Sequence, residues 1–195
     1  MNVYATTIWS EDFESYTDNS TVASDNNTTD IGVDWGINTS GASPDYFRVE
    51  NNFWFTPITG DKSFAGKETD GEIVWTTESV DISGYTNIAV SINYGEQGNQ
   101  NGGDYIIIQY EVNGNGTWMT LGNGSHSNDM GGVESASTTG LSGTSIRLRV
   151  RIDCNDNDEI WFFDDVLIAG TSALSCDPCY SCLLYTSDAA DDSLR

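Results

Sequence analysis

Two adjacent carboxylates, Asp164 and Asp165, stand in the middle of EIWFFDDVLIA at 159–169, a segment made mostly of aromatic and aliphatic side chains. Two further acids, Asp12 and Glu14, lie near the N-terminus. Ca²⁺ takes about six to eight oxygen ligands and tolerates irregular geometry. Four carboxylates in one small volume would repel one another unless a cation neutralised them. We predict that these four acids form a structural calcium site, provided that the first and last strands lie together. The alternative is that they face water or pair with arginines.

The segment DCNDNDE at 153–159 offers a second set of alternating oxygen ligands. It lacks the glycine and the distal glutamate that complete an EF-hand loop. We therefore predict a polar hairpin turn here rather than a second calcium site.

Three aromatic residues are candidates for a glycan-binding surface, because the predicted strands do not clearly place them in the core: Trp54, Trp118 and Tyr46. Sugars bind to flat aromatic rings together with a few convergent hydrogen-bonding groups. The favoured alternative is that these are ordinary core or rim residues, since large aromatic side chains are usually buried.

A row of three arginines lies on one face of the segment SIRLRVRI at 145–152, where apolar and basic residues alternate. Arg147, Arg149 and Arg151 could recognise acidic sugars. Because the chain holds 30 acidic and only 7 basic residues, ion pairs within the chain are the favoured role of this row.

The sequence shows no catalytic constellation. A glycosidase needs two carboxylates about 5–10 Å apart across a cleft, and nothing marks Glu72 and Glu78, on one predicted strand, as such a pair. The E-x-D-x-x-E motif of laminarinase-like glycosidases is absent. The single histidine, His126, falls in a predicted loop, which argues against Ser-His-Asp and Cys-His chemistry. Cys154 is predicted to be a buried thiol.

Short alternating segments must position these residues. Typical examples are NIAVSINY at 87–94 and DYIIIQYEV at 104–112, with a hairpin through the Asn-Gly repeat at 113–116. We expect a long polar loop at 122–143, because that segment is rich in Gly and Ser. The pattern predicts about nine or ten strands and no helix. The predicted fold class is therefore all-β, a jelly-roll β-sandwich of two antiparallel sheets.

The amino-acid composition limits the classes of molecule that the protein can be expected to bind. The net charge of −23 disfavours nucleic acid and anionic membranes and favours cations. No apolar run approaches the roughly 18 residues that a membrane span needs, so we expect no membrane insertion. No N-terminal segment has the form of a secretory signal. Since the composition is otherwise typical of extracellular proteins, we expect a fragment of a longer secreted protein.

Several segments together resemble jelly-roll accessory modules of large secreted bacterial proteins. They are SEDFES at 10–15, DYFRVENN at 45–52, DGEIVWTTESVDISGYTNIAVSI at 70–92, DYIIIQYEVNG at 104–114 and FDDVLIAG at 163–170. The resemblance extends to MAM-like and carbohydrate-binding modules, which open with a D-F-E-type strand and close with a D-D-V-type strand. It implies a non-catalytic domain, and calcium is bound in some modules of this kind. This chain departs from these modules at 54–66, where its segment is longer than theirs.

The last residues, CLLYTSDAADDSLR at 182–195, resemble the translation of a transposase sequencing adapter, a contaminant of environmental gene fragments. We expect this tail to be an artefact, which removes Cys182 from the apparent cluster with Cys176 and Cys179 and argues against a zinc or redox role. The predicted domains are a β-sandwich at 1–170, a linker at 171–181 and the tail.

Together these observations predict a non-catalytic extracellular or cell-surface module that binds a polysaccharide or cell-surface glycan or supports adhesion, with covalently linked neighbouring domains. The first alternative is an architectural spacer domain. The second is a divergent polysaccharide-active enzyme.

Overall fold

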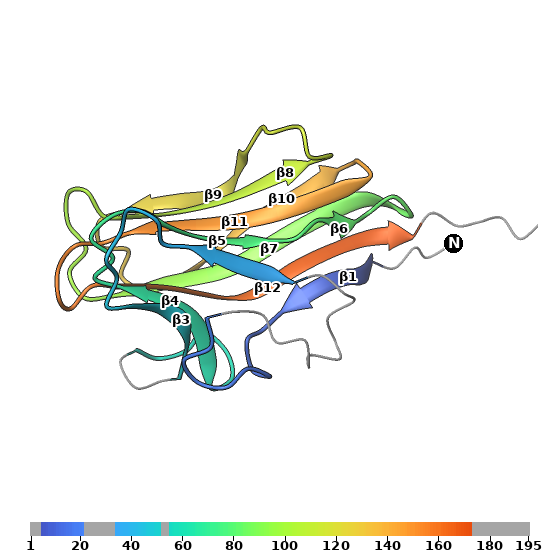
Figure 1. The fold of residues 1–195 in the computed structure, drawn as a ribbon. Coiled ribbons are helices and arrows are strands. Elements are labelled where there is room, and N and C mark those ends of the chain that lie inside the picture. The colour runs from blue at the N-terminus through green and yellow to red at the C-terminus, as the bar shows by residue number, and fades with distance from the viewer. Residues whose placement is uncertain (1–4, 22–33, 52–54, 173–195) are drawn as a thin grey trace, which may run out of the picture.

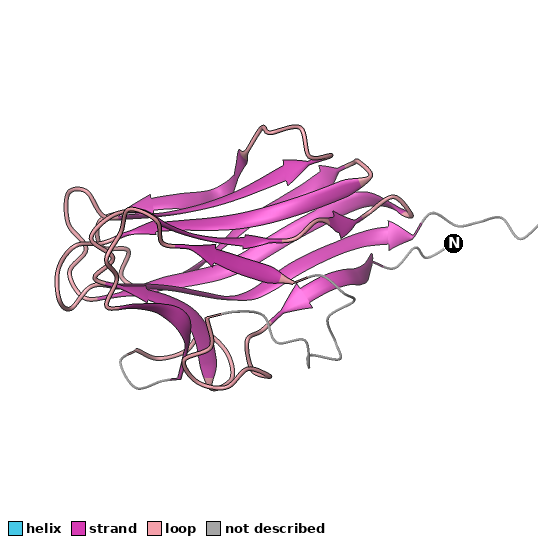
Figure 2. Cartoon of the chain, viewed as in Figure 1, coloured by secondary structure: helices cyan, strands magenta, loops and turns pink. Residues whose placement is uncertain are grey.

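The computed structural model describes residues 5–21, 34–51 and 55–172, which form twelve strands and no helix (Figure 2). The strands are β1 (Ala5–Glu11), β2 (Trp35–Asn38), β3 (Tyr46–Asn51), β4 (Lys62–Lys67), β5 (Ile73–Thr77), β6 (Val80–Asp81), β7 (Tyr85–Gln97), β8 (Tyr105–Val112), β9 (Met119–Ser127), β10 (Val133–Leu141), β11 (Ser145–Asp153) and β12 (Ile160–Ser172). In this part of the chain no helix is long and apolar enough to cross a membrane.

The strands form two antiparallel sheets (Figure 1). One has the order β2-β5-β11-β8-β9, and the other has the order β10-β7-β12-β4-β3. A single residue pair, Ser137 with Gly122, joins β10 to β9, so the two sheets are continuous along one side. Strand β1 pairs with the C-terminal half of β12, and β6 pairs with the start of β11. The predicted fold class is confirmed.

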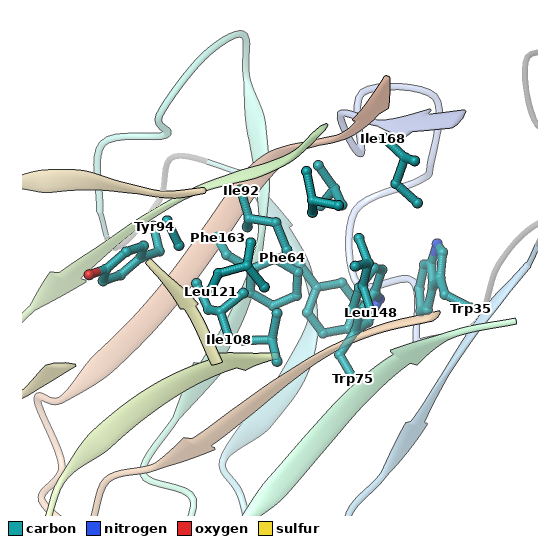
Figure 3. Close-up of a cluster of buried hydrophobic side chains, with 14 of the residues drawn as sticks. Trp35, Phe64, Trp75, Ile92, Tyr94, Ile108, Leu121, Leu148, Phe163 and Ile168 are labelled. Carbon is teal, nitrogen blue, oxygen red and sulfur yellow. The ribbon is translucent and has the colours of Figure 1, made fainter. Parts of the chain in front are cut away.

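The core forms between the inward faces of the two sheets. Strand β11 contributes Ile146, Leu148, Val150 and Ile152, all fully buried, as its alternating sequence predicts. Figure 3 shows aromatic side chains from both sheets in this core: Trp35 and Trp75 come from the sheet that contains β11, and Phe64 and Phe163 come from the opposite sheet. Residues on the outward face of β11 remain half-buried, so the arginine row faces away from the core.

Two strands occupy the segment for which we predicted a loop. Strand β9 continues to Ser127 and β10 follows from Val133, so the loop prediction at 122–143 is wrong. The reason is that β10 buries only Ala136 and is rich in Ser and Thr, so its sequence shows no alternating apolar face. Its backbone pairs with β7 along seven residue pairs, which hydrophobic periodicity cannot reveal. The described residues form twelve strands, against the expected nine or ten.

Candidate functional site

A β-bulge separates the two adjacent acids of β12. The register of β12 against β7 shifts between Asp164 and Leu167, and Asp165 has a φ of 50°. Asp164 is fully buried, and its carboxylate accepts hydrogen bonds from the Ser63 hydroxyl at 3.2 Å and the Asp165 backbone amide at 2.8 Å. Burial, with a smaller contribution from the charge of Asp165, raises the pKa of Asp164 to about 7.

The carboxylate of Asp165, unlike that of Asp164, lies near the surface. It accepts hydrogen bonds from the Thr59 hydroxyl at 2.9 Å and from the Asn93 side-chain amide at 3.0 Å. Asp165 and Asn93 line a hollow of about 410 Å³, together with Asp12, which directly follows β1. Of the four acids predicted to bind calcium, Asp12 and Asp165 therefore share one hollow.

Glu14 serves a structural role in the turn before β4. Its Oε1 accepts hydrogen bonds from the backbone amides of Asp61 at 2.8 Å and Lys62 at 2.9 Å. Gly60 has a φ of 58°, a left-handed conformation that glycine adopts readily, and a Cβ atom there would displace the Glu14 carboxylate from this position. Among residues 5–21, 34–51 and 55–172, no three His, Cys, Asp or Glu side chains form a metal-binding group. The calcium site stays a prediction, and the structure does not bring its four acids together.

The segment 153–159 is a polar turn, but the predicted hairpin is wrong, because β11 and β12 belong to different sheets. Glu159 organises the turn from within. Its Oε2 accepts hydrogen bonds from the backbone amides of Asn155 at 3.0 Å and Asp156 at 2.8 Å. Glu159 is fully buried, and this burial raises its pKa.

Tyr46 belongs to a second, smaller apolar cluster on the outward side of β3, β4 and β12, formed by Tyr46, Phe55, Ala65, Ile160 and Phe162 with Ile58. Only 8% of Tyr46 is exposed, and the guanidinium carbon of Arg48 lies 4.7 Å from the centre of its ring. The Tyr46 ring is therefore packed against other side chains and is not exposed for stacking against a sugar. Trp54 lies outside the described residues.

Trp118 lies against the arginine row. It ends the turn between β8 and β9 and is half-buried. Its ring centre lies 4.3 Å from the guanidinium carbon of Arg149 and 5.2 Å from that of Arg147. A guanidinium at such a distance from an indole ring is attracted by its negative π face. The turn thus places an indole on the outward face of the sheet.

The arginines at the two ends of the row are neutralised within the chain, as the sequence favoured. Arg147 donates two hydrogen bonds to Oε2 of Glu111, from Nε at 2.9 Å and from Nη2 at 2.5 Å. Arg151 forms an ion pair with Glu72, which also accepts a hydrogen bond from the Tyr105 hydroxyl at 2.6 Å.

Arg149, in the middle, differs from both neighbours. Its Nε donates to Oε1 of Gln109 at 2.8 Å, and Gln109 in turn donates to the Thr120 hydroxyl at 3.4 Å. Within the described part of the chain Arg149 forms no ion pair, because each of the four ion pairs there involves another cation. Sequence reasoning missed Gln109, although its outward position follows from the alternation of the 104–112 segment.

The residues considered for catalysis either bind other side chains or lie outside the predicted arrangement. Glu72 is bound to Arg151, and Glu78 is an exposed residue beyond the end of β5. His126 lies on β9, 6.3 Å from the Trp161 ring, and not in a loop as predicted. Cys154 is a buried thiol, as predicted, and burial raises its pKa to about 11.

No family model matches the chain, and no curated protein matches it. Among solved structures, the K2 cleaved adhesin domain of Lys-gingipain is similar with a TM-score of 0.51 and 15% identity, over 82% of this chain and 98% of that one. TmCBM61 in complex with beta-1,4-galactotriose has a TM-score of 0.49 and 12% identity, over 69% and 86% of the two chains. A xylan-binding domain from CBM 22 has a TM-score of 0.49 and 11% identity, over 86% and 97%.

At these identities the likeness shows the fold alone, and the adhesin domain carries that comparison. The predicted all-β sandwich is thereby confirmed, and its fold is similar to that of an adhesin domain.

Proposed function

We propose that this chain is a non-catalytic β-sandwich module that binds a glycan on the outward face of the β2-β5-β11-β8-β9 sheet. The observation that carries this proposal is the position of Trp118, a half-exposed indole held over that face beside Arg149. An aromatic ring beside fixed hydrogen-bonding groups is the arrangement with which proteins bind sugars.

The polar groups of this face are already oriented. The residue pairs of the sheet place Gly36, Thr76, Arg149, Gln109 and Thr120 side by side across β2, β5, β11, β8 and β9. We call these five residues the Arg149 row. Hydrogen bonds hold the side chains of Arg149 and Gln109 within it. A sugar that binds there pays little for ordering the protein side chains.

An extracellular or cell-surface setting and linked neighbouring domains are part of this proposal. The similarity in fold to an adhesin domain supports them. A structural calcium ion also remains part of the proposal, and it rests on Asp12 and Asp165, which share a hollow.

Retention of the full chain on a panel of immobilised polysaccharides tests the proposal. We expect retention on at least one class, and we expect Trp118→Ala to weaken it by about tenfold or more, since aromatic contacts dominate such sites. The control is Val133→Ala, because Val133 is 54% exposed and lies on β10 of the other sheet. A folded chain that no polysaccharide retains would favour the architectural spacer.

A further inference from the structure

The few basic residues of this acidic chain are concentrated in one place. Three of its seven Lys and Arg residues lie on the outward face of β11. Glu111, with a side chain that is 2% exposed, neutralises Arg147, and Glu72 neutralises Arg151. Arg149 therefore carries the one charge of this arginine row that no carboxylate of the described residues pairs with.

The geometry around Arg149 leaves its terminal nitrogens available. Gln109 binds Nε, and the Trp118 ring lies 4.3 Å from the guanidinium carbon. No hydrogen bond within the described residues uses Nη1 or Nη2 of Arg149. A guanidinium fixed by its Nε and by an aromatic ring presents two parallel N–H donors, and this fork matches a carboxylate or a sulfate.

The Arg149 row contains no acidic side chain that could compete for these donors. On one side of Arg149 it continues through Thr76 to Gly36. A Cβ atom built at Gly36 would meet nothing within 4 Å, so the surface above β2 is open. On the other side lie Gln109 and Thr120, which are neutral hydrogen-bonding residues. A bound sugar can therefore extend in either direction across the strands.

We propose that the glycan is anionic and that Arg149 binds its charged group, either a uronate carboxylate or a sulfate ester, while a sugar ring lies beside Trp118. This inference rests on the proposed function and names the ligand class of the same site. The net charge of −23 does not prevent such binding, because charges more than about 8 Å away are largely screened at physiological ionic strength. The interaction is therefore local, and it weakens as salt is added.

The test compares charged polymers with their neutral counterparts in chelator, which removes calcium bridging. Polygalacturonate and its fully methyl-esterified form test the carboxylate, and dextran sulfate and dextran test the sulfate. We expect the full chain to bind at least one charged polymer about tenfold or more tightly than its neutral form, and Arg149→Gln to remove most of this difference. Arg149→Lys keeps the positive charge but lacks the two parallel N–H donors, so it should retain part of the preference for the charged polymer.

Lys67→Gln is the matched control, because it removes the same charge from β4 in the other sheet. We expect it to bind as the wild-type chain does, and circular dichroism checks the fold of every variant. Equal binding of charged and neutral forms, or an unchanged preference in Arg149→Gln, would overturn the inference and leave glycan binding in place. Failure to bind any polymer, charged or neutral, would overturn the proposed function itself.

Discussion

The guanidinium carbon of Arg149 lies 4.3 Å from the centre of the Trp118 ring, although Arg149 belongs to the central strand β11 and Trp118 to the turn after β8. The contact therefore fixes the turn at 113–118 against the outward face of the sheet. It also helps to fix the guanidinium, whose Nε donates a hydrogen bond to Gln109. A flexible cation thus becomes an oriented one.

Trp118→Ala should reduce stability only slightly, because Trp118 is half-buried and lies outside the core clusters. We expect a loss of about 0.5–2 kcal/mol, the range for a cation–π contact and the area around it. Urea unfolding measures this loss. A loss above about 4 kcal/mol would show that the indole is a core residue and would argue against its role as a sugar platform.

Gln109→Met should weaken glycan binding several-fold without unfolding the protein. Methionine keeps the length of the side chain but replaces the amide oxygen with a weakly accepting thioether sulfur, so the guanidinium loses its fixed direction. The NMR signal of the Arg149 Nε–H group should move in this variant even without ligand. If that signal and the affinity both stay unchanged, Gln109 does not position Arg149.

Asp164 should make the free energy of unfolding depend on pH between about 4 and 7. Its pKa is raised from 3.8 to about 7, so the folded state holds a proton that the unfolded state releases. This contribution is fully present below pH 4 and is lost as pH rises through 7. Relative to the wild type, Asp164→Asn should gain on the order of 4 kcal/mol between pH 4 and pH 8. Urea unfolding of both proteins at the two pH values gives the difference. An equal change in both would show that Asp164 keeps an ordinary pKa.

Millimolar calcium should raise the thermal midpoint of the full chain relative to chelator. Asp12 and Asp165 would be the ligands, since they line the same hollow. Asp165→Asn should remove the effect, whereas Asp45→Asn should not, because Asp45 pairs with Lys67 elsewhere on the surface. If calcium leaves the thermal midpoint unchanged, the protein has no structural calcium site.

The sequence predicted the parts of this face that follow from alternation. In β11 a period of two residues places Arg147, Arg149 and Arg151 on one side, and the structure confirms it. Which arginine lacks a carboxylate could not be predicted, because that depends on the residues that the sheet pairs place next to each one. Arg147 lies opposite Glu111 on β8, whereas Arg149 lies opposite Gln109.

Two other features could not be predicted from the sequence pattern, for physical reasons. The bulge at Asp165 breaks the alternation of β12, so two adjacent acids that looked like one site point to different surroundings. Strand β10 is held by backbone pairing and buries a single side chain, so its Ser and Thr residues gave the signal of a loop.

An NMR titration of the full chain with short oligogalacturonates, in chelator, tests the central claim most directly. If the Arg149 row binds the glycan, the Nε–H signals of Arg149 and Trp118 and the side-chain amide of Gln109 should shift first and saturate together. Signals of β10 and β7 in the other sheet should stay in place. A saturable shift confined to that other sheet would contradict the account, as would a titration with no saturable shift for this ligand, its sulfated counterparts and neutral oligosaccharides alike.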